Sequence, residues 1–196
     1  MEKSSARKTR VFLSGPMTGY EDYNFGKFDA VAESLRGAGV DVVNPADICR
    51  RYRRERVLAD EAVFRKMIDE QQAAERTCTA VLLLDGWEAS AGVRKELATA
   101  LELGLDLFLE KDAGLLRSMA RTPGARLGHA ARRISDEDWK TQSARGYPDV
   151  PAGARVLVLE EGMYNFYGGP WTRVEWNGNM YWTKPDSVSV LGKENS

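Results

Sequence analysis

The sequence predicts an α/β fold: a three-layer, Rossmann-like or flavodoxin-like parallel sheet with helices on both faces, followed by a small C-terminal β appendage. Two observations within the first 110 residues predict the main domain. Short, almost continuous apolar runs recur there, and segments with helical spacing separate them. Apolar runs without alternation are typical of parallel strands buried on both faces, and the β-α-β order supplies the crossovers that such strands need.

The first strand is predicted at residues 11–13, and the loop 14–19, SGPMTG, ends it abruptly. Asn24 is expected to cap the helix that follows, because its side chain is a preferred helix N-cap. Apolar side chains recur at helical spacing over residues 28–35 and predict the body of that helix. Residues 40–43 predict a second short strand.

The same alternation continues to residue 109. Residues 63–76 predict a helix, and residues 81–84 predict a third buried strand. A further helix is expected from Gly92 to its closing glycine, Gly104. Residues 105–109 predict a fourth strand, so the four strands and their connecting helices form one domain over residues 1–110.

Three loops that follow strands have unusual sequences, and they are predicted to meet. Right-handed crossovers place the loops after parallel strands at one edge of the sheet. These loops are residues 14–19, Asn44-Pro45, and residues 85–90. Ligands of open α/β sheets bind outside the carboxyl ends of the strands, so the sequence predicts a binding site there.

The rest of the chain has a different character. Residues 111–152 are rich in Arg, Gly, Ala and Pro with little periodicity, and they predict a linker or mobile excursion that can contain one short helix. Residues 153–196 predict a small β-hairpin appendage. Its strongest signal is Asn177-Gly178 between two alternating runs, because Asn-Gly supplies the positive φ angles of a type I′ turn.

Composition limits the function classes. The net charge is −1, from 28 basic and 29 acidic residues, which argues against nucleic-acid or membrane-surface partners. The chain has two cysteines, Cys49 and Cys78, outside any metal-like spacing, and a reducing cytoplasm is the expected compartment. The one histidine is His129, so acid–base chemistry within the first hundred residues is expected to use carboxylates, without a metal.

The segment from Gly86 to Glu96 contains the best candidates for chemistry. Ser90 can cap the helix that begins near Gly92, and the free N–H groups of that helix start form an anion site. Glu96 lies further along the same helix, where its carboxylate can point to the same pocket. The more ordinary interpretation is a Ser-capped helix with an exposed glutamate.

Other candidates also have ordinary interpretations. Asp69 or Glu70 can supply a second carboxylate, or both can be solvated charges on a helix face. The loop 14–19 alone is a weak phosphate-binding signal. Aromatic and polar side chains that can wall a base pocket, or simply pack as loop residues, are Tyr20, Tyr23, Asn24 and Trp87.

Three segments, residues 11–30, 40–48 and 82–104, resemble the nucleoside 2-deoxyribosyltransferase-like superfamily, in particular a small branch frequent in phage and bacterial genomes and the related deoxynucleoside 5′-monophosphate N-glycosidases. The resemblance covers about residues 9 to 110. It implies that Glu96 attacks C1′ and forms a covalent deoxyribosyl-enzyme, and that Ser90 holds the 5′-phosphate. It places the family aspartate that assists the leaving base at Asp69.

The expected substrate-binding residues are those of the three loops and the helix start: Ser14, Gly15, Pro16, Met17, Gly19, Asn24, Asn44, Trp87, Ser90 and Gly92. The chemistry implied by the resemblance needs no cofactor, since a carboxylate can stabilise and trap an oxocarbenium-like C1′ as in retaining glycosidases. The resemblance also implies a homodimer or larger homo-oligomer. The expected compartment remains the cytoplasm, which is the host cytoplasm if a phage encodes the protein.

The first function expected is therefore a 2′-deoxynucleotide N-glycosidase or deoxyribosyltransferase acting on a deoxynucleoside monophosphate. Two departures from the family pattern keep a non-catalytic nucleotide-binding protein, sequestering or sensing, as the alternative. Phe12 stands where the family often has a tyrosine, and Thr79 stands where it often has an aspartate. A third hypothesis is a partner-binding role for the aromatic C-terminal hairpin, which more often packs on its own domain.

Overall fold

The computed structural model describes residues 9–122, 126–131, 133–134, 148–165, 168–177 and 179–190. The chain divides into two compact units, Met1–Arg117 and Ser118–Ser196. The expected linker at 111–152 spans this division.

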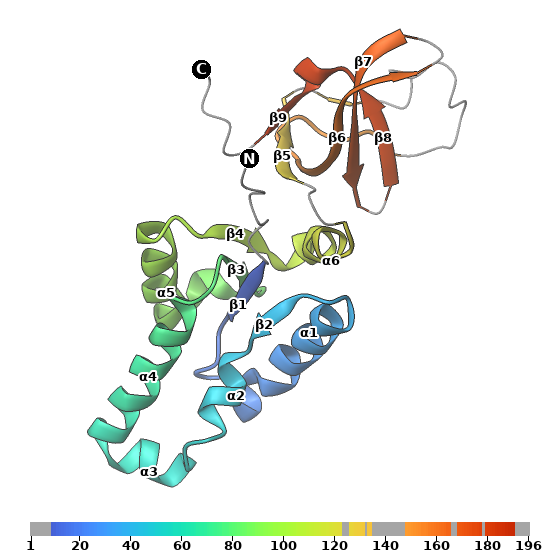
Figure 1. Ribbon diagram of the computed structural model, residues 1–196. Coiled ribbons are helices and arrows are strands. Elements are labelled where there is room, and N and C mark those ends of the chain that lie inside the picture. Colours follow the sequence, from blue (N-terminus) through green and yellow to red (C-terminus); the bar gives the residue numbers. More distant parts are fainter. Residues whose placement is uncertain are drawn as a thin grey trace, which may run out of the picture. The chain divides into compact units, whose positions relative to one another are not determined.

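A four-stranded parallel sheet forms the centre of the first unit (Figure 1). Its strands are β1 (Arg10–Ser14), β2 (Asp41–Val43), β3 (Ala80–Leu83) and β4 (Asp106–Leu109), in the order β2-β1-β3-β4. In β1, all residues after Arg10 are buried, as are all residues of β3, because both strands have neighbours on each side and helices on each face. The predicted parallel sheet is confirmed.

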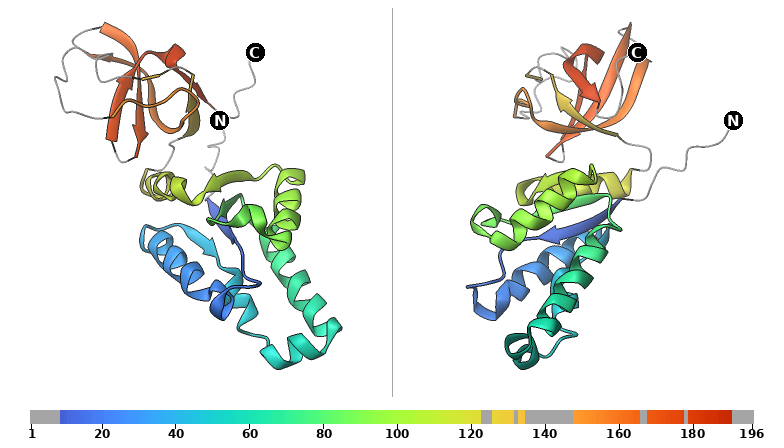
Figure 2. Two further views of the ribbon diagram at one scale, coloured as in Figure 1. Left: turned by 180° about the vertical axis from the view of Figure 1, so that it is seen from behind. Right: turned by 90° about the vertical axis from the view of Figure 1, so that its left-hand side faces the viewer.

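Among the described residues, five α-helices lie between these strands in the chain, and a sixth, α6, follows β4. They are α1 (Phe25–Gly37), α2 (Pro45–Cys49), α3 (Arg54–Ala59), α4 (Glu61–Glu75), α5 (Ala91–Glu102) and α6 (Ala113–Arg121). The strand order reverses direction at β1, and right-handed crossovers in opposite directions place their helices on opposite faces. Accordingly, α4 and α5 lie on one side of the sheet and α1 lies on the other (Figures 1 and 2).

Side-chain caps fix the starts of the two helices that face each other. Asp60 accepts hydrogen bonds from the backbone N–H groups of Ala62 and Val63 at the start of α4. Ser90 accepts one from Val93 at the start of α5, as predicted. These bonds satisfy N–H groups that have no partner within the helix.

The expected side-chain cap by Asn24 is wrong. Asn24 precedes α1, but its backbone is left-handed, with φ of 60°, and its side chain accepts no hydrogen bond from the helix. A short 3₁₀ turn, η1 (Glu21–Asn24), leads into α1 and sets this conformation. The side-chain amide of Asn24 instead donates to the carbonyl of Pro16 at 3.0 Å and so holds the first loop.

The second unit contains a five-stranded antiparallel sheet in the order β8-β7-β6-β5-β9. Its strands are β5 (Arg126–Ala130), β6 (Arg155–Asn165), β7 (Gly168–Trp176), β8 (Asn179–Thr183) and β9 (Val188–Val190). Strands β7 and β8 form the expected hairpin, and Asn177 between them has a φ of 49°. Gly178 lies outside the described residues.

The structure differs from the expected linker over residues 111–152. This segment contributes α6 and the strand β5, which pairs with β6 on one side and β9 on the other. The sequence of β5, RLGHA, has no clear alternation of apolar and polar residues. Gly128 in its middle packs closely against the neighbouring strand, because a Cβ there would lie 2.9 Å from the carbonyl oxygen of Ser189. Residues 123–125, 132 and 135–147 lie outside the described residues.

Candidate functional site

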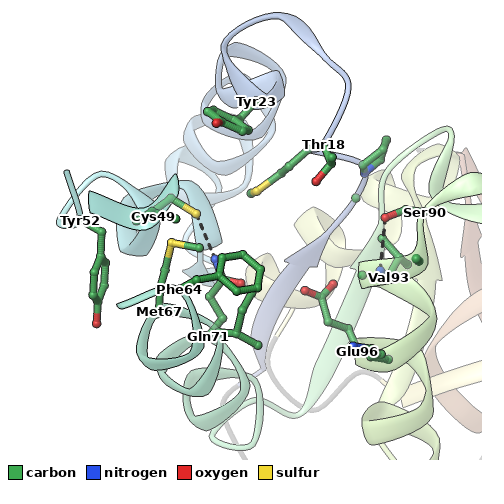
Figure 3. Close-up of a pocket in the computed structure, with 18 of the residues that line it drawn as sticks. Thr18, Tyr23, Cys49, Tyr52, Phe64, Met67, Gln71, Ser90, Val93 and Glu96 are labelled. Atoms are coloured by element: carbon green, nitrogen blue, oxygen red, sulfur yellow. Dashed lines mark hydrogen bonds between the residues drawn. The ribbon is translucent and has the colours of Figure 1, made fainter. Parts of the chain in front are cut away.

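A cavity of about 1200 Å³ opens at the carboxyl ends of β1 and β3 (Figure 3). One wall consists of the loop after β1 and the beginning of α5. The opposite wall consists of α2, α3 and α4. The cavity therefore lies at the sheet edge where the loops were predicted to meet.

Glu96 points into this cavity from the second turn of α5 (Figure 3). The hydroxyl of Ser14, the last residue of β1, donates a hydrogen bond of 2.5 Å to Oε2 of Glu96. Ser14 is fully buried, and Glu96 is half-buried. Burial raises the pKa of Glu96, and the hydrogen bond from Ser14 opposes that rise because it stabilises the ionised carboxylate.

Ser90 lines the same cavity and is the N-cap residue of α5, the helix that carries Glu96. Its oxygen accepts from the N–H of Val93 at 3.3 Å, and its own O–H remains able to donate. Gly92 also lines the cavity, and a Cβ at Gly92 would find only Ser90 Oγ nearby, at 3.7 Å. The helix start, the hydroxyl and the open backbone together present hydrogen-bond donors suited to an anion.

The first loop contributes four consecutive residues to the cavity: Gly15, Pro16, Met17 and Thr18. Gly15 is tightly packed beneath this loop, because a Cβ there would lie 2.9 Å from Cβ of Leu84 and 3.2 Å from the ring of Phe28. The predicted residues Gly15, Pro16 and Met17 therefore meet Ser90, Gly92 and Glu96 in one cavity.

Five residues that were predicted to bind substrate lie outside the cavity lining. One is Ser14, whose hydroxyl instead bonds to the carboxylate of Glu96. Asn24 holds the carbonyl of Pro16, and Gly19 is a turn residue with a φ of 88°. Asn44 is buried, caps α2 by accepting from Ala46, and donates to Asp29. Trp87 packs against the apolar cluster beneath the loop. These last four residues shape the loops and packing around the cavity and do not line it.

The opposite wall is largely apolar and aromatic. Phe64, Met67 and Gln71 of α4 face the cavity, and the amide of Gln71 donates to the sulfur of Cys49 at 3.0 Å (Figure 3). Tyr20 and Tyr23, expected as wall residues, line the cavity as well. Sequence reasoning missed Phe64 and Met67 as wall residues, because their helical spacing also predicts an ordinary core-facing stripe.

The candidate second carboxylates occupy different positions on α4. Asp69 is exposed at the rim of the cavity. Glu70 accepts a hydrogen bond of 2.7 Å from the hydroxyl of Tyr52 and pairs with Arg51 at 2.6 Å. The sequence pattern alone did not indicate which of these two carboxylates lines the cavity.

A third carboxyl, which sequence reasoning missed, is Glu75 at the end of α4. Its side chain is fully buried, and neither oxygen has a hydrogen-bond partner among the described residues. Burial, reinforced by the charge of Glu96, raises the pKa of Glu75 to about 8. Only its position four residues after Gln71, on the buried face of an amphipathic helix, could have indicated it.

Within the described residues, no group of His, Cys, Asp and Glu side chains is arranged to hold a metal ion. No helix in that part of the chain is both long and apolar enough to cross a bilayer. The cavity itself combines a carboxylate, a hydroxyl-bearing helix start and an aromatic wall.

The fold and the cavity define the first unit as an α/β domain with a ligand-sized site at the carboxyl edge of a parallel sheet. Residues 9–109 match the family described as a domain of unknown function, DUF4406, and the chain belongs to this family. The matched region contains every cavity residue named above. A comparison with curated proteins finds no match.

Proposed function

We propose that this protein cleaves the N-glycosidic bond of a 2′-deoxynucleoside 5′-monophosphate, as a hydrolase or a deoxyribosyltransferase. The observation that carries the proposal is that Glu96 and Ser90, on one helix, line one cavity, with Ser14 bonded to the carboxylate of Glu96. The resemblance to the nucleoside 2-deoxyribosyltransferase-like superfamily supports the same assignment.

In the proposed reaction the 5′-phosphate binds at the start of α5, where Ser90 and backbone N–H groups donate to it. Ser14 donates to Oε2 of Glu96, which leaves Oε1 to attack C1′. The C1′–N bond breaks as the C1′–O bond forms, and the base leaves with the electron pair. The base takes up a proton from water or from the carboxyl group of Asp69 at the rim of the cavity. Water, or the nitrogen of another base, then attacks C1′ and releases Glu96 as a carboxylate.

The aromatic and apolar wall suits the base. Phe64 is 45% exposed although it faces the cavity, and Tyr20 is 51% exposed. Flat rings that are left open to a cavity can stack on a nucleobase, and burying them on binding supplies apolar driving force. The exposed Leu58 beside them also fits the expected homo-oligomer, in which a second copy would cover this rim.

The test is incubation with a panel of canonical and modified deoxynucleoside monophosphates, followed by chromatography for released base. Glu96→Gln and Glu96→Ala are expected to lower base release by about 1000-fold or more, since removing a covalent nucleophile removes the whole pathway. The matched control is Glu102→Gln, at an exposed position on the same helix. Unchanged turnover in both Glu96 variants would refute the mechanism.

The second candidate is a nucleotide-binding protein without catalysis. It is favoured by Phe12, which is fully buried in the apolar cluster and brings no hydroxyl to Glu96 from the first strand. This candidate predicts binding of a deoxynucleoside monophosphate by calorimetry with no released base. The hydroxyl of Ser14 argues for the enzyme, because it gives Glu96 a donor from the end of the same strand.

A further inference from the structure

Glu75 is a buried ionisable group that the proposed reaction does not use. It is the last residue of α4, and its side chain has no exposed surface. Both of its oxygens lack a hydrogen-bond partner among the described residues. A buried carboxylate without a partner is costly, whereas a protonated carboxyl is much less so. The fold therefore keeps a group that is expensive to ionise at this position.

Glu96 is the charged residue that acts most strongly on Glu75. The charge of Glu96 disfavours ionisation of Glu75, and α4, which ends at Glu75, packs against α5, which carries Glu96. Arg76, the next residue in the chain, acts in the opposite direction but more weakly. Among the described residues, these are the charged groups that act on Glu75, and the buried Cys78 lies three residues beyond it.

The two carboxyl groups are not equivalent. Glu96 receives the hydrogen bond from Ser14 and faces the cavity, whereas Glu75 receives none in the described structure and is enclosed. When two carboxyl groups interact, the first negative charge settles on the group that a donor stabilises, and that charge opposes ionisation of the other group. The proton of the pair then remains on the other group.

We propose that Glu75 and Glu96 form a carboxyl pair with one shared negative charge, in which Glu75 holds the proton and is a positioning residue that keeps the charge on Glu96 at the cavity. The positioning role of Glu75 toward Glu96 rests on the proposed function. The protonation of Glu75 is a property of the protein without substrate.

The test is infrared titration of the full-length protein without ligand, following the carbonyl stretching band of protonated carboxylic acids. The wild type is expected to show a band that persists at neutral pH and is lost as the pH rises through the pKa of Glu75, near 8. Glu75→Gln is expected to lose this band, while Glu33→Gln, an exposed position on α1, keeps it. An unchanged band in Glu75→Gln would overturn the proposal.

A second variant tests the coupling and does not depend on the folding of Glu75→Gln. In Glu96→Gln the neighbouring charge is absent, so the band of Glu75 is expected to persist but to titrate at lower pH. An identical titration in the wild type and Glu96→Gln would show that the groups are not a pair. Failure to release base from any substrate would refute the proposed enzyme and leave both infrared results standing.

Discussion

The hydroxyl of Ser14 and the carboxylate of Glu96, 82 residues apart in the chain, are joined by a hydrogen bond of 2.5 Å at the cavity. We predict that Ser14→Ala lowers kcat/KM for base release at neutral pH by about 10- to 100-fold, the range expected for losing a hydrogen bond to a charged group. The lost bond favoured the ionised form, so the pKa of Glu96 rises further and the acid limb of the pH–rate profile moves to higher pH.

The control for this prediction is Ser34→Ala, an exposed serine on α1. Ser14→Cys, which retains a weaker donor of similar shape, is expected to fall between the wild type and Ser14→Ala. A loss of activity in Ser14→Ala with no displacement of the acid limb would contradict the proposed role of the hydrogen bond.

Helix caps allow binding to be separated from stability. Ser90→Ala and Asp60→Ala each remove a side-chain cap, of α5 and α4 respectively, and each is expected to lower the free energy of unfolding by about 0.5–2 kcal/mol. Ser90→Ala alone is expected to weaken binding of a deoxynucleoside monophosphate more than binding of the corresponding nucleoside. Denaturant titration and calorimetry measure the two effects, and an equal loss of binding in both variants would argue against a phosphate site at Ser90.

The raised pKa of Glu75 predicts a pH-dependent stability. Its pKa is about 8 in the folded chain and near 4.5 when unfolded, so between these values the folded state binds the extra proton. The contribution of Glu75 to stability is therefore present below about pH 4.5 and is lost as the pH rises toward 8.

Glu75→Gln removes this dependence, because its amide does not ionise. We expect the variant to gain stability relative to the wild type with rising pH, by on the order of a few kcal/mol at pH 8 and above. Thermal or denaturant unfolding at a series of pH values measures the difference. A constant difference between the two proteins from pH 5 to 9 would be inconsistent with a buried, protonated Glu75.

The packing under the first loop predicts opposite results for two glycines. Gly15→Ala is expected to lower the free energy of unfolding by about 1–3 kcal/mol, because the new methyl group meets Leu84 and Phe28. Gly26→Ala is expected to be neutral or slightly stabilising, because a Cβ there meets nothing within 4 Å and alanine is the better helix former. Denaturant unfolding of both variants checks this, and similar losses would show that the loop can give way.

The strands and the edge of the cavity could be predicted from sequence because each depends on local patterns. Buried parallel strands are continuous apolar runs, and the cap by Ser90 follows from its position before the α5 pattern. The role of Ser14 depends on a contact across 82 residues, which no local pattern encodes. Glu75 was missed for a related reason, since a charged residue on a helix normally indicates a solvated face.

The second unit was harder to predict, because its strands depend on pairing with neighbouring strands as well as on their own residues. Strand β5 contains Gly128 and lacks alternation, and it is ordered between β6 and β9. Asn24 shows the same limit at a helix end. A preferred capping residue was present at the predicted position, but the preceding turn gave it a left-handed backbone and directed its amide to Pro16.

Because Ser90 and Glu96 belong to one rigid helix, their spacing along its axis is fixed at about 9 Å by the helical rise. Insertions or deletions in the loop before Ser90 would carry both groups together and preserve the interval. One residue inserted between them would instead rotate Glu96 by about 100° around the axis, away from Ser14. If the proposed function holds, α5 thus sets the distance between the phosphate and the reacting carbon of the substrate, whereas residues of the α4 wall can differ with the base.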